Sequence, residues 1–460
     1  MEQFDVVVIG AGPGGYPAAI RVAQRGASVA IVERERLGGT CLNFGCIPTK
    51  ALIASAETFF RVRHAKSLGV SVSGAAVDYA AMIDRKDRVV AQLRNGVKQL
   101  LTANGVKQFA GAAAFKDRNT IAIDGETTVG AKKTIVATGS TSATPDFLPK
   151  HQRIVDSRSF LSLTRLPASM IVLGGGYIGC EIASMAAMLG VKVVIVELLA
   201  DILNPLDADL RGEVRGHMEK ALGVRVLTGR PLADISADGD GVRGVVGDEA
   251  LTADLLLNAV GRRPATDGLN LGAAGLTTNE RGFIETDACC RTKAATIFAV
   301  GDVAGKTQLA HFATAQGLAA AENAVGRRPR AHPTLVPNVI FTSPEVATVG
   351  LSEAEAAAEN RVVRIGKFRF SGLGKALAAG ETAGFVKWIA DADSDQLLGA
   401  AAAGPHATEL IAAATTAIRA EFTTRELGET IHAHPTFSEA WMEAAHALHG
   451  ESVHAPPRRR

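Results

Sequence analysis

The hydrophobic positions near the N-terminus predict a buried strand, a glycine-rich turn and a helix. Residues 4–9 are mostly apolar, which is typical of a strand buried on both faces of a parallel sheet. They lead into a turn at residues 10–15 and then into an alanine-rich segment of helical character. A second strand, residues 28–32, ends in the acid Glu33. The order is therefore strand, G-x-G-x-x-G turn, helix, strand and acid.

The same order returns in the middle of the chain. Residues 170–173 are apolar, and residues 174–179 repeat the glycine pattern. A helix that carries Glu181 follows, and then a strand at residues 193–196 that ends in Glu197. The chain therefore contains two complete units of one kind, which we call the first and the second glycine motif.

The chemistry of such a unit is that of dinucleotide binding. Its glycines let the backbone approach a pyrophosphate, the helix N-terminus faces that group, and the acid accepts a ribose hydroxyl. Two units predict two dinucleotides. Glu197 favours NAD over NADP, because a carboxylate repels a 2′-phosphate and the next arginine, Arg211, lies too far along the chain. A third match at residues 239–244 lacks a preceding strand and a following helix, so we interpret it as a turn between two strands.

The remaining pattern is less specific. From residue 59 to about residue 101 it is helical, and short strands follow. Residues 134–136 then form an apolar run that ends in the small residues Ala137, Thr138, Gly139 and Ser140. At such a strand end the chain could approach a cofactor or cross another strand.

Two of the five cysteines, Cys41 and Cys46, lie between the first unit and the next helical segment. On one regular helix their Cα atoms would stand roughly 8–9 Å apart, whereas a disulfide needs less than about 7 Å. A bond between them requires a break in the helix, which Asn43 and Gly45 would tolerate. Pro48 suits the first turn of a following helix, whose dipole would favour a thiolate. A reversible redox dithiol, a static disulfide and two buried thiols all fit this spacing.

Composition narrows the class of protein. A length of 460 residues predicts roughly two to four domains. A net charge of +2, with charges interspersed, gives no reason to invoke nucleic acid, and the terminal Arg458–Arg460 run is most simply a solvated tail. We expect no secretory signal, no membrane span, no metal site and no secreted disulfide framework, so the cytoplasm is the expected compartment.

The motifs together resemble the pyridine nucleotide–disulfide oxidoreductase family over nearly the whole chain. The likeness is strongest to members that oxidise dihydrolipoamide as the flavoprotein component of 2-oxoacid dehydrogenase complexes. It rests on the two glycine motifs, the segment from Cys41 to Lys50, and the segments at residues 260–264, 296–302, 341–346 and 432–439.

The resemblance implies FAD at the first glycine motif and NAD at the second. Asp302 would then hydrogen-bond the ribityl–phosphate region, Ala310 would lie beside the flavin, and Gly261 would line the NAD site. Lys50, paired with Glu181, would place a cation near flavin N5, where it stabilises the reduced anion. The residues expected at the two cofactors are Gly10, Gly12, Gly15, Glu33, Thr40, Lys50, Gly139, Asp302 and Ala310 for FAD, and Gly174, Gly175, Gly176, Tyr177, Ile178, Gly179, Glu197 and Gly261 for NAD.

The resemblance also implies the catalytic groups. Cys41 would exchange with the lipoyl thiol and Cys46 would interact with the flavin, while His434, oriented by Glu439, would act as base from the partner subunit of a homodimer. Glu439 has another explanation, since Thr436 and Glu439 fit a capping box. A lipoyl-bearing acyltransferase (E2) is the implied partner.

Alternatives remain at this stage. Tyr177 also occurs in glutathione reductase and mercuric reductase relatives, where it gates the nicotinamide pocket. Glu197 disfavours an NADP-dependent glutathione reductase, and the last cysteines, Cys289 and Cys290, do not form the C-terminal pair of mercuric reductases. A non-catalytic flavoprotein subunit is the alternative from another class.

The expected fold is α/β, with two Rossmann-like dinucleotide-binding domains and a C-terminal α+β dimerisation domain. We place an FAD domain at residues 1–148, an NAD domain at 149–264, a return to the FAD domain at 265–335 and the interface domain at 336–460.

Overall fold

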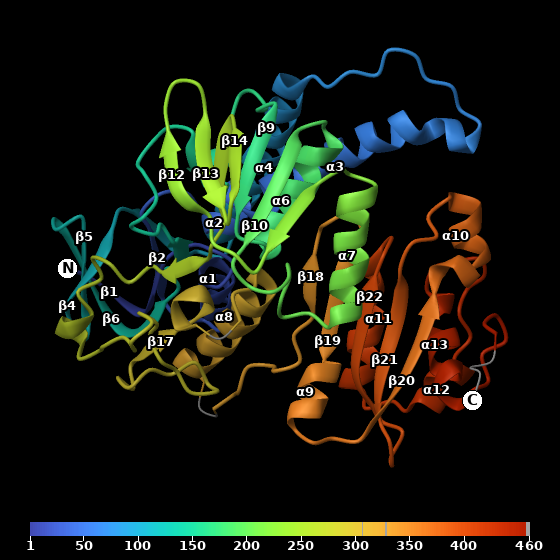
Figure 1. The fold of residues 1–460 in the computed structure, drawn as a ribbon. Coiled ribbons are helices and arrows are strands. Elements are labelled where there is room, and N and C mark those ends of the chain that lie inside the picture. Colours follow the sequence, from blue (N-terminus) through green and yellow to red (C-terminus); the bar gives the residue numbers. More distant parts are fainter. Residues whose placement is uncertain (306, 327–328, 457–460) are drawn as a thin grey trace.

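The N-terminal apolar run forms the middle of a parallel sheet in the computed structural model, which describes residues 1–305, 307–326 and 329–456 (Figure 1). The order is β3-β2-β1-β6-β5-β4, and β17 also pairs with β6. The strands β1, β2, β3, β6 and β17 run parallel, and β4 and β5 are antiparallel. The bounds are β1 Glu2–Ile9, β2 Val29–Glu33, β3 Lys107–Ala110, β4 Ala113–Asp117, β5 Thr120–Ile123, β6 Thr127–Val136 and β17 Ile297–Ala299.

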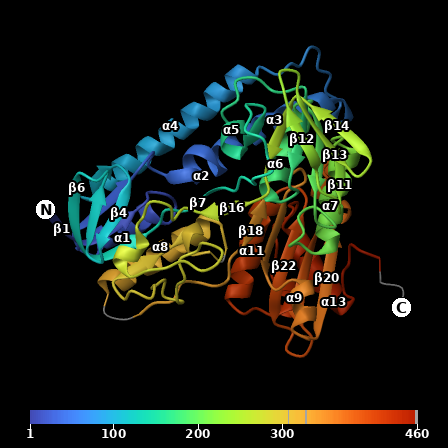
Figure 2. The ribbon, with the colours of Figure 1, turned by 60° about the vertical axis from the view of Figure 1, so that its left-hand side comes forward.

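Helices cover this first sheet and connect it to the rest of the molecule. The helices α1 and α8 pack together against one face, and the long α4 runs beside them toward the second sheet (Figure 2). The bounds are α1 Gly15–Gln24, α2 Gly39–Phe44, α3 Cys46–His64, α4 Tyr79–Ala103 and α8 Ala310–Val325, with 3₁₀ turns η1 Ala65–Leu68, η2 Leu271–Ala274 and η3 Gly301–Ala304.

The second sheet is parallel throughout, in the order β11-β10-β9-β15-β8. An antiparallel sheet, β12-β13-β14, lies beside it, and residues 239–244 include the turn between β12 and β13, as predicted. The bounds are β8 Ile154–Asp156, α5 Ser157–Phe160, β9 Ser169–Leu173, α6 Tyr177–Met188, β10 Lys192–Glu197, α7 Ala208–Lys220, β11 Arg225–Thr228, β12 Ala233–Ala237, β13 Val242–Val246, β14 Glu249–Ala253 and β15 Leu255–Asn258.

A two-stranded ribbon joins the first two units. In it β7 (Ser140–Ser142) pairs antiparallel with β16 (Arg262–Pro264). The chain therefore leaves the first sheet along one strand and returns along the other, after which β17 adds to the first sheet.

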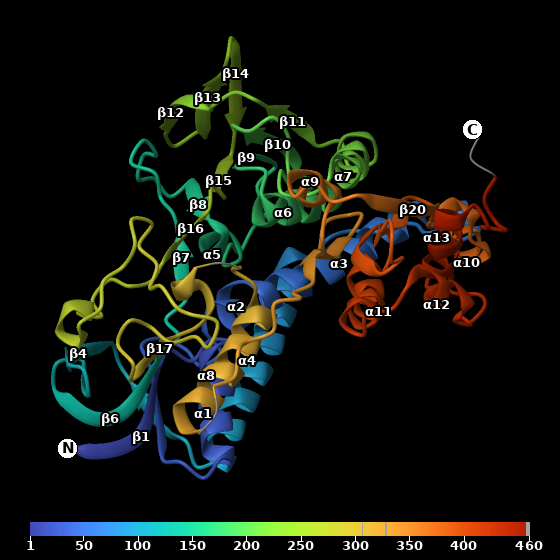
Figure 3. The ribbon, with the colours of Figure 1, turned by 90° about the horizontal axis from the view of Figure 1, so that it is seen from below.

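The C-terminal unit is an antiparallel sheet, β18-β19-β22-β21-β20, covered by short helices (Figure 3). Its core centres on Trp388 and Trp441, whose rings lie 4.6 Å apart. The bounds are β18 Asn338–Ile340, β19 Val346–Gly350, α9 Glu353–Ala358, β20 Val363–Arg369, η4 Phe370–Gly372, α10 Gly374–Ala379, β21 Phe385–Asp391, β22 Leu397–Ala403, α11 Ala407–Arg419, α12 Thr424–Glu429 and α13 Glu439–His449.

The predicted fold class is confirmed, and so is the predicted helical character from residue 59 to about residue 101, except for one interruption. The helical stretch from residue 59 to about residue 101 is two helices, α3 and α4, separated by residues 69–78. Gly69 and Gly74 adopt φ of +78° and +75°, which a continuing helix does not allow, and the apolar residues between them are exposed. The domain boundaries stay a prediction, and the Arg458–Arg460 tail lies outside the described residues.

No helix in the described part of the chain is long and apolar enough to span a membrane.

Candidate active site

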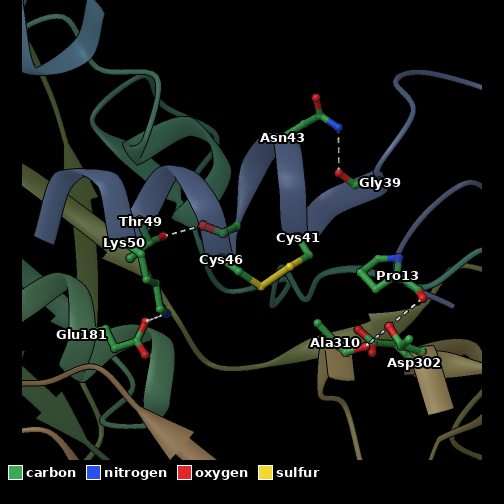
Figure 4. The surroundings of a disulfide bond; sticks show 12 residues. Pro13, Gly39, Cys41, Asn43, Cys46, Thr49, Lys50, Glu181, Asp302 and Ala310 are labelled. Carbon is green, nitrogen blue, oxygen red and sulfur yellow. Dashed lines mark hydrogen bonds and ion pairs between the residues drawn. A yellow bond between two sulfur atoms is a disulfide. The ribbon is translucent and has the colours of Figure 1, made fainter. Parts of the chain in front are cut away.

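Cys41 and Cys46 form a disulfide where one helix ends and the next begins (Figure 4). Cys41 lies in α2 and Cys46 is the first residue of α3, and their Cα atoms are 4.7 Å apart. Gly45, with φ −141° and ψ −107°, breaks the helix between them. The predicted departure from regular helix is confirmed at Gly45.

Asn43 does not take part in this break, contrary to the prediction. It is helical and buried within α2, and its side-chain amide donates to the carbonyls of Leu37 (2.9 Å) and Gly39 (3.0 Å). It therefore fixes the start of α2. Pro48 lies in the first turn of α3 as predicted, and the disulfide is at the N-terminus of a 19-residue helix.

The start of α2 packs directly on the first glycine motif. The Gly38 N–H donates to the Ala11 carbonyl at 2.8 Å, and a Cβ at Gly39 would stand 2.6 Å from the Gly12 Cα. Figure 4 shows Pro13, Asp302 and Ala310 on one side of the sulfurs, and Lys50 and Glu181 on the other. The disulfide is therefore adjacent to the first predicted dinucleotide site.

Within each motif the three glycines serve different physical purposes. Gly10 and Gly174 turn the chain at φ +98° and +105°. Gly12 and Gly176 face open space, since a Cβ there would meet nothing closer than 3.9 Å at Gly12 and nothing within 4 Å at Gly176. Such space suits the approach of a pyrophosphate to the backbone.

The last glycine of each motif brings the helix against the strand end. A Cβ at Gly15 would collide with the Gly10 carbonyl oxygen, and one at Gly179 with that of Gly174. The other predicted glycines fit the same picture, since Gly139 (φ +73°) and Gly261 (φ +138°) face open space and Gly175 packs against Ile202.

The two acids that end the second strands hold the glycine loops. Glu33 accepts the N–H of Ala11 at 2.8 Å, and Glu197 accepts that of Gly175 at 2.6 Å. Their second oxygens accept the N–H groups of Glu35 and Leu199. Sequence reasoning missed this role, although the matching position of the acid in the two units signals it. A carboxylate has further lone pairs, so each acid can still accept a ribose hydroxyl.

Asp302 belongs to a small polar network at the first site. The Ser140 hydroxyl donates to Asp302 at 2.5 Å, and Arg262 donates to the Ser140 hydroxyl and carbonyl, each at 2.7 Å. Beside Ser140, the buried Thr138 hydroxyl has no hydrogen-bond partner among the described residues. An unsatisfied buried hydroxyl next to the open space at Gly139 fits a bound cofactor.

Thr40 and Ala310 complete the residues predicted at this site. Thr40 is in the first turn of α2, and Ala310 begins α8. The hydroxyl of Thr314, one turn into α8, donates to the Pro13 carbonyl at 2.9 Å, so α8 is fixed to the first glycine motif.

Lys50 and Glu181 form the ion pair that was predicted, at 2.7 Å. Lys50 is one turn into α3 from Cys46, and its ammonium also lies 4.3 Å from the centre of the Phe341 ring. The second oxygen of Glu181 accepts the Phe341 N–H at 2.9 Å. The pair therefore joins α3, α6 and the segment after β18.

The second glycine motif opens into a cleft of about 1410 Å³. Gly174, Gly176, Tyr177, Ile178, Glu197 and Gly261 all line it. The Tyr177 hydroxyl accepts a hydrogen bond from the Asn338 amide at 2.7 Å, while Asn338 Oδ1 is buried without a partner in the described part of the chain. Burial raises the pKa of Tyr177, although the Asn338 hydrogen bond opposes that rise.

His434 and Glu439 lie together, 2.8 Å apart between Nδ1 and Oε1. Glu439 Oε2 accepts the Thr436 N–H at 2.8 Å. The predicted capping box is wrong, because Ser438 is the N-cap of α13 and the Thr436 hydroxyl bonds to the Ala433 carbonyl instead. Burial raises the pKa of Glu439, but the Thr436 N–H and His434 outweigh it and hold the pKa below its usual value.

The structure does not bring His434 to the disulfide of its own chain. The helix α13, which follows His434, lies apart from α2 in all three ribbon views (Figures 1, 2 and 3). The His434 side chain is 74% exposed, so it is open to a second molecule. A cavity of about 770 Å³ leads to Cys41, lined by Tyr16, Leu42, Ile47, one face of α4 and His311.

Three other histidines of this segment, His432, His446 and His449, contact nearby groups of the same segment or of α12. His449 contacts the Thr424 hydroxyl at 2.8 Å, and His432 contacts the Thr430 carbonyl at 2.8 Å. His446 packs against Gly428.

Comparison with known proteins supports the family suggested by the motifs. Residues 4–317 match the family model described as pyridine nucleotide-disulphide oxidoreductase, and residues 336–445 match the dimerisation domain of the same family. The latter supports a homodimer.

Curated relatives match over the full length. A dihydrolipoyl dehydrogenase of Chlamydia muridarum is 42% identical over 464 residues and covers 100% of both chains. One of Thermus scotoductus is 42% identical and covers 99% of both, and one of Bacillus subtilis is 40% identical and covers 98% of this chain and 99% of its own.

Solved structures show the same fold. LpdA from Mycobacterium tuberculosis superposes with a TM-score of 0.90 at 27% identity, over 97% of this chain and 100% of that one. The Cu(II) complex of the HOCl-induced flavoprotein disulfide reductase RclA from Escherichia coli gives 0.88 at 28% identity, over 97% and 99%.

Proposed function

This chain belongs to the pyridine nucleotide-disulphide oxidoreductase family, and on that premise we propose that it oxidises dihydrolipoamide to lipoamide with NAD as electron acceptor. It is a dihydrolipoyl dehydrogenase-like flavoprotein disulfide oxidoreductase with the pair Cys41 and Cys46. The lipoyl substrate, the acceptor and the protein that carries the lipoyl group belong to the proposal.

The family implies FAD, and we place it at the first glycine motif. The open space at Gly12 and Gly139 and the unsatisfied Thr138 hydroxyl support that site. Bound there, FAD supplies a two-electron carrier between the cysteine pair and the NAD site. Glu33, Thr40, Asp302 and Ala310 would hold it.

The cysteines carry out the exchange. One thiolate of dihydrolipoamide attacks the Cys41 sulfur, forming a mixed disulfide and releasing Cys46 as a thiolate. The second lipoyl thiolate then attacks the lipoyl sulfur of the mixed disulfide, so that oxidised lipoamide leaves and Cys41 is released. The dihydrolipoamide has lost two electrons and two protons, and the cysteine pair has gained the electrons.

The protons go to His434 of the partner subunit. Its imidazole must be neutral to accept a proton from an attacking thiol, so the first proton must pass to solvent before the second thiol is deprotonated. Glu439 holds the Nδ1 side so that Nε2 faces outward. The exposure of the His434 side chain and the position of α13, which lies apart from α2 within one chain, support this assignment.

Lys50 and Glu181 would hold a positive charge beside the second cysteine. Lys50 is four residues along α3 from Cys46, so it lies on the same face one turn away. A cation and a helix N-terminus both favour a thiolate at Cys46.

The observation that carries the proposal is the disulfide across the break between α2 and α3, packed on the first glycine motif. The test is a comparison of Cys41→Ser with Cys46→Ser in the holoenzyme. Both should lose dihydrolipoamide oxidation, and only the variant that keeps Cys46 should develop long-wavelength thiolate–flavin absorbance at high pH. Full turnover by Cys46→Ser would contradict the assignment.

Substrate assays distinguish the related reductases. Dihydrolipoamide, glutathione disulfide and mercuric ion should each be tested with both NAD(H) and NADP(H). Preference for glutathione disulfide with NADPH would favour the glutathione reductase alternative, and Glu197 predicts the opposite. Binding of a lipoyl-bearing E2 subunit is a separate test of the proposed partner.

A further inference from the structure

Lys387 is a buried cation that neither glycine motif nor the disulfide uses. It lies in the middle of β21, and its side chain is 0% exposed. Its ammonium contacts Asp207 at 2.9 Å, Asp209 at 3.0 Å and Glu353 at 2.6 Å. A fully buried lysine with three carboxylates is rare enough to need an explanation.

The three carboxylates come from two different units of the molecule. Asp207 and Asp209 are at the start of α7, which belongs to the second parallel unit, whereas Glu353 begins α9 of the C-terminal unit. Asp207 also accepts the N–H groups of Glu353 and Ala354, at 3.3 and 3.4 Å. In Figure 1, α7 packs against β22 of the C-terminal sheet, and α9 lies below α7. Lys387 therefore ties α7 to α9 across the junction of the two units.

Electrostatics favour the charged forms of Lys387 and Asp209 in spite of their burial. Burial lowers the pKa of Lys387, but its bonds to Glu353 and Asp207 outweigh burial and raise the pKa above its ordinary value. Burial raises the pKa of Asp209, and Lys367 and Lys387 together reverse that effect and lower it. Lys387 is thus the buried cation on which the three carboxylates converge.

This cluster borders the cleft of the second glycine motif. Leu206, Asp207 and Leu210 line the cleft from the α7 side, and Ser352 and Glu355 line it from the α9 side. Gly174 and Glu197 line the same cleft. The spacing between α7 and α9 therefore sets part of the shape of the dinucleotide site.

We propose that Lys387 is a positioning residue for the dinucleotide: by pairing with Asp207, Asp209 and Glu353 it fixes α7 and α9 as one wall of the cleft. The inference rests on the proposed function, since it concerns the NAD site. Without the ammonium, three carboxylates whose ligand atoms all lie within 4.8 Å of one another repel, and the two helices separate.

The chain offers a matched control. Lys367 of β20 is the direct cross-strand partner of Lys387 and also pairs with Asp209, at 2.9 Å, but its side chain is 26% exposed. Lys367→Met therefore removes the same charge from the rim of the same cluster. Solvent compensates for a lost rim charge far better than for a buried one.

The experiment measures NAD⁺ binding to the oxidised holoenzyme by calorimetry, together with the rate at which dihydrolipoamide reduces it. Lys387→Met should raise the Kd for NAD⁺ about fivefold or more, and Lys367→Met should change it less than twofold. Neither should alter reduction by dihydrolipoamide, because that step does not use the cleft. Hydrogen exchange should increase in residues 206–212 and 351–358 of Lys387→Met.

Two further variants distinguish a loss of NAD⁺ affinity caused by repulsion between the carboxylates from one caused by misfolding. In K387M/D209N/E353Q the repulsion is removed, so NAD⁺ affinity should return to within about twofold of the wild type. Glu353→Gln alone removes the ion pair of Lys387 with α9 and keeps the N–H groups of Glu353 and Ala354 on Asp207. Because the Glu353 side chain is 43% exposed, this variant should fold and show a smaller loss of affinity. It provides the measurement if Lys387→Met does not fold.

Three results would overturn the inference: unchanged NAD⁺ affinity in Lys387→Met and Glu353→Gln, an equal loss of NAD⁺ binding and of reduction by dihydrolipoamide, or a triple variant as defective as Lys387→Met. Failure of the proposed function itself would be recognised separately, because the wild type would then not bind NAD⁺.

Discussion

At the scale of single residues, some residues of the site belong to recognisable sequence motifs, whereas others are identified only by their contacts in the folded structure. The cysteines, Lys50 and Glu181 belong to motifs: the family resemblance implied the ion pair of Lys50 with Glu181, and the spacing of the cysteines left a disulfide as one of three possibilities. The contact of Asn338 with Tyr177 spans 161 positions, and no periodicity links them. The hydrogen bonds that join Arg262, Ser140 and Asp302 were not predicted, for the same reason, although Arg262 belongs to one of the sequence motifs.

The contact between Asn338 and Tyr177 leads to a prediction about nucleotide binding. Tyr177 lines the second cleft and is one helical turn before Glu181 on α6, so the two side chains lie on the same face of the helix. Tyr177→Phe and Asn338→Ala each remove the same hydrogen bond, which is worth about 1 kcal/mol. Each should change the KM for NAD about fivefold, and the double variant should add little more. Fully additive effects of the two substitutions would show that the hydrogen bond does not act as a unit.

At the scale of elements, the strand–turn–helix units could be predicted because three levels of pattern agree there. The apolar run, the glycine spacing and the acid at the next strand end all point to one structure. Between α3 and α4 the helical pattern did not reveal the interruption at residues 69–78, where Gly69 and Gly74 adopt positive φ. The break at Gly45 was predictable from disulfide geometry, whereas the helical conformation of Asn43 depends on two carbonyls that sequence does not place.

The glycines of the first motif give a matched pair of substitutions. Gly15→Ala should destabilise the protein by about 1–3 kcal/mol, because its Cβ would collide with the Gly10 carbonyl oxygen. Gly12→Ala meets no atom closer than 3.9 Å, so the apoprotein should keep its thermal stability while FAD binding weakens. Thermal unfolding of the apoproteins and FAD titration measure the two effects. Equal loss of stability in both variants would contradict the distinct purposes assigned to these glycines.

The packing of α1 on α8 includes an ion pair with a defined pH dependence. Glu322 of α8 contacts Arg25 at 2.7 Å and Arg21 at 2.9 Å, and the side-chain bond to Arg25 is the main reason why its pKa falls to about 2. A pKa that is lower in the folded state stabilises the protein above the unfolded value, near 4.5, and this stabilisation is lost as pH falls toward 2.

Glu322→Gln should therefore lower the free energy of unfolding at pH 7 by about 1 kcal/mol, a value reduced by solvent screening. The difference from the wild type should shrink as pH falls below 4.5. Urea unfolding at pH 7, 5 and 4 measures it. A difference that grows on acidification would contradict the assigned ion pair.

At the scale of the whole molecule, the α/β class and the two parallel sheets follow from the repeated unit, and the dimerisation domain follows from the family. The sequence pattern does not predict how the sheets pack against one another. The charged junction at Lys387 has no signature in the sequence, because a lysine in an apolar strand is indistinguishable from one at an edge until its neighbours are known. The pattern also did not show that α13, which follows His434, lies apart from α2, although the family resemblance implied that His434 acts from the partner subunit.

The most direct measurement of the central claim, that a disulfide of one subunit works with an imidazole of the other, is complementation in heterodimers. One subunit carries Cys41→Ser and Cys46→Ser, and the other carries His434→Gln. Each homodimer should be inactive in dihydrolipoamide oxidation. A purified heterodimer joins the intact cysteines of one chain to the intact His434 of the partner subunit in one of its two sites, so it should recover about half of the wild-type activity. Heterodimers no more active than the parent homodimers would place the base within the same chain and contradict the account.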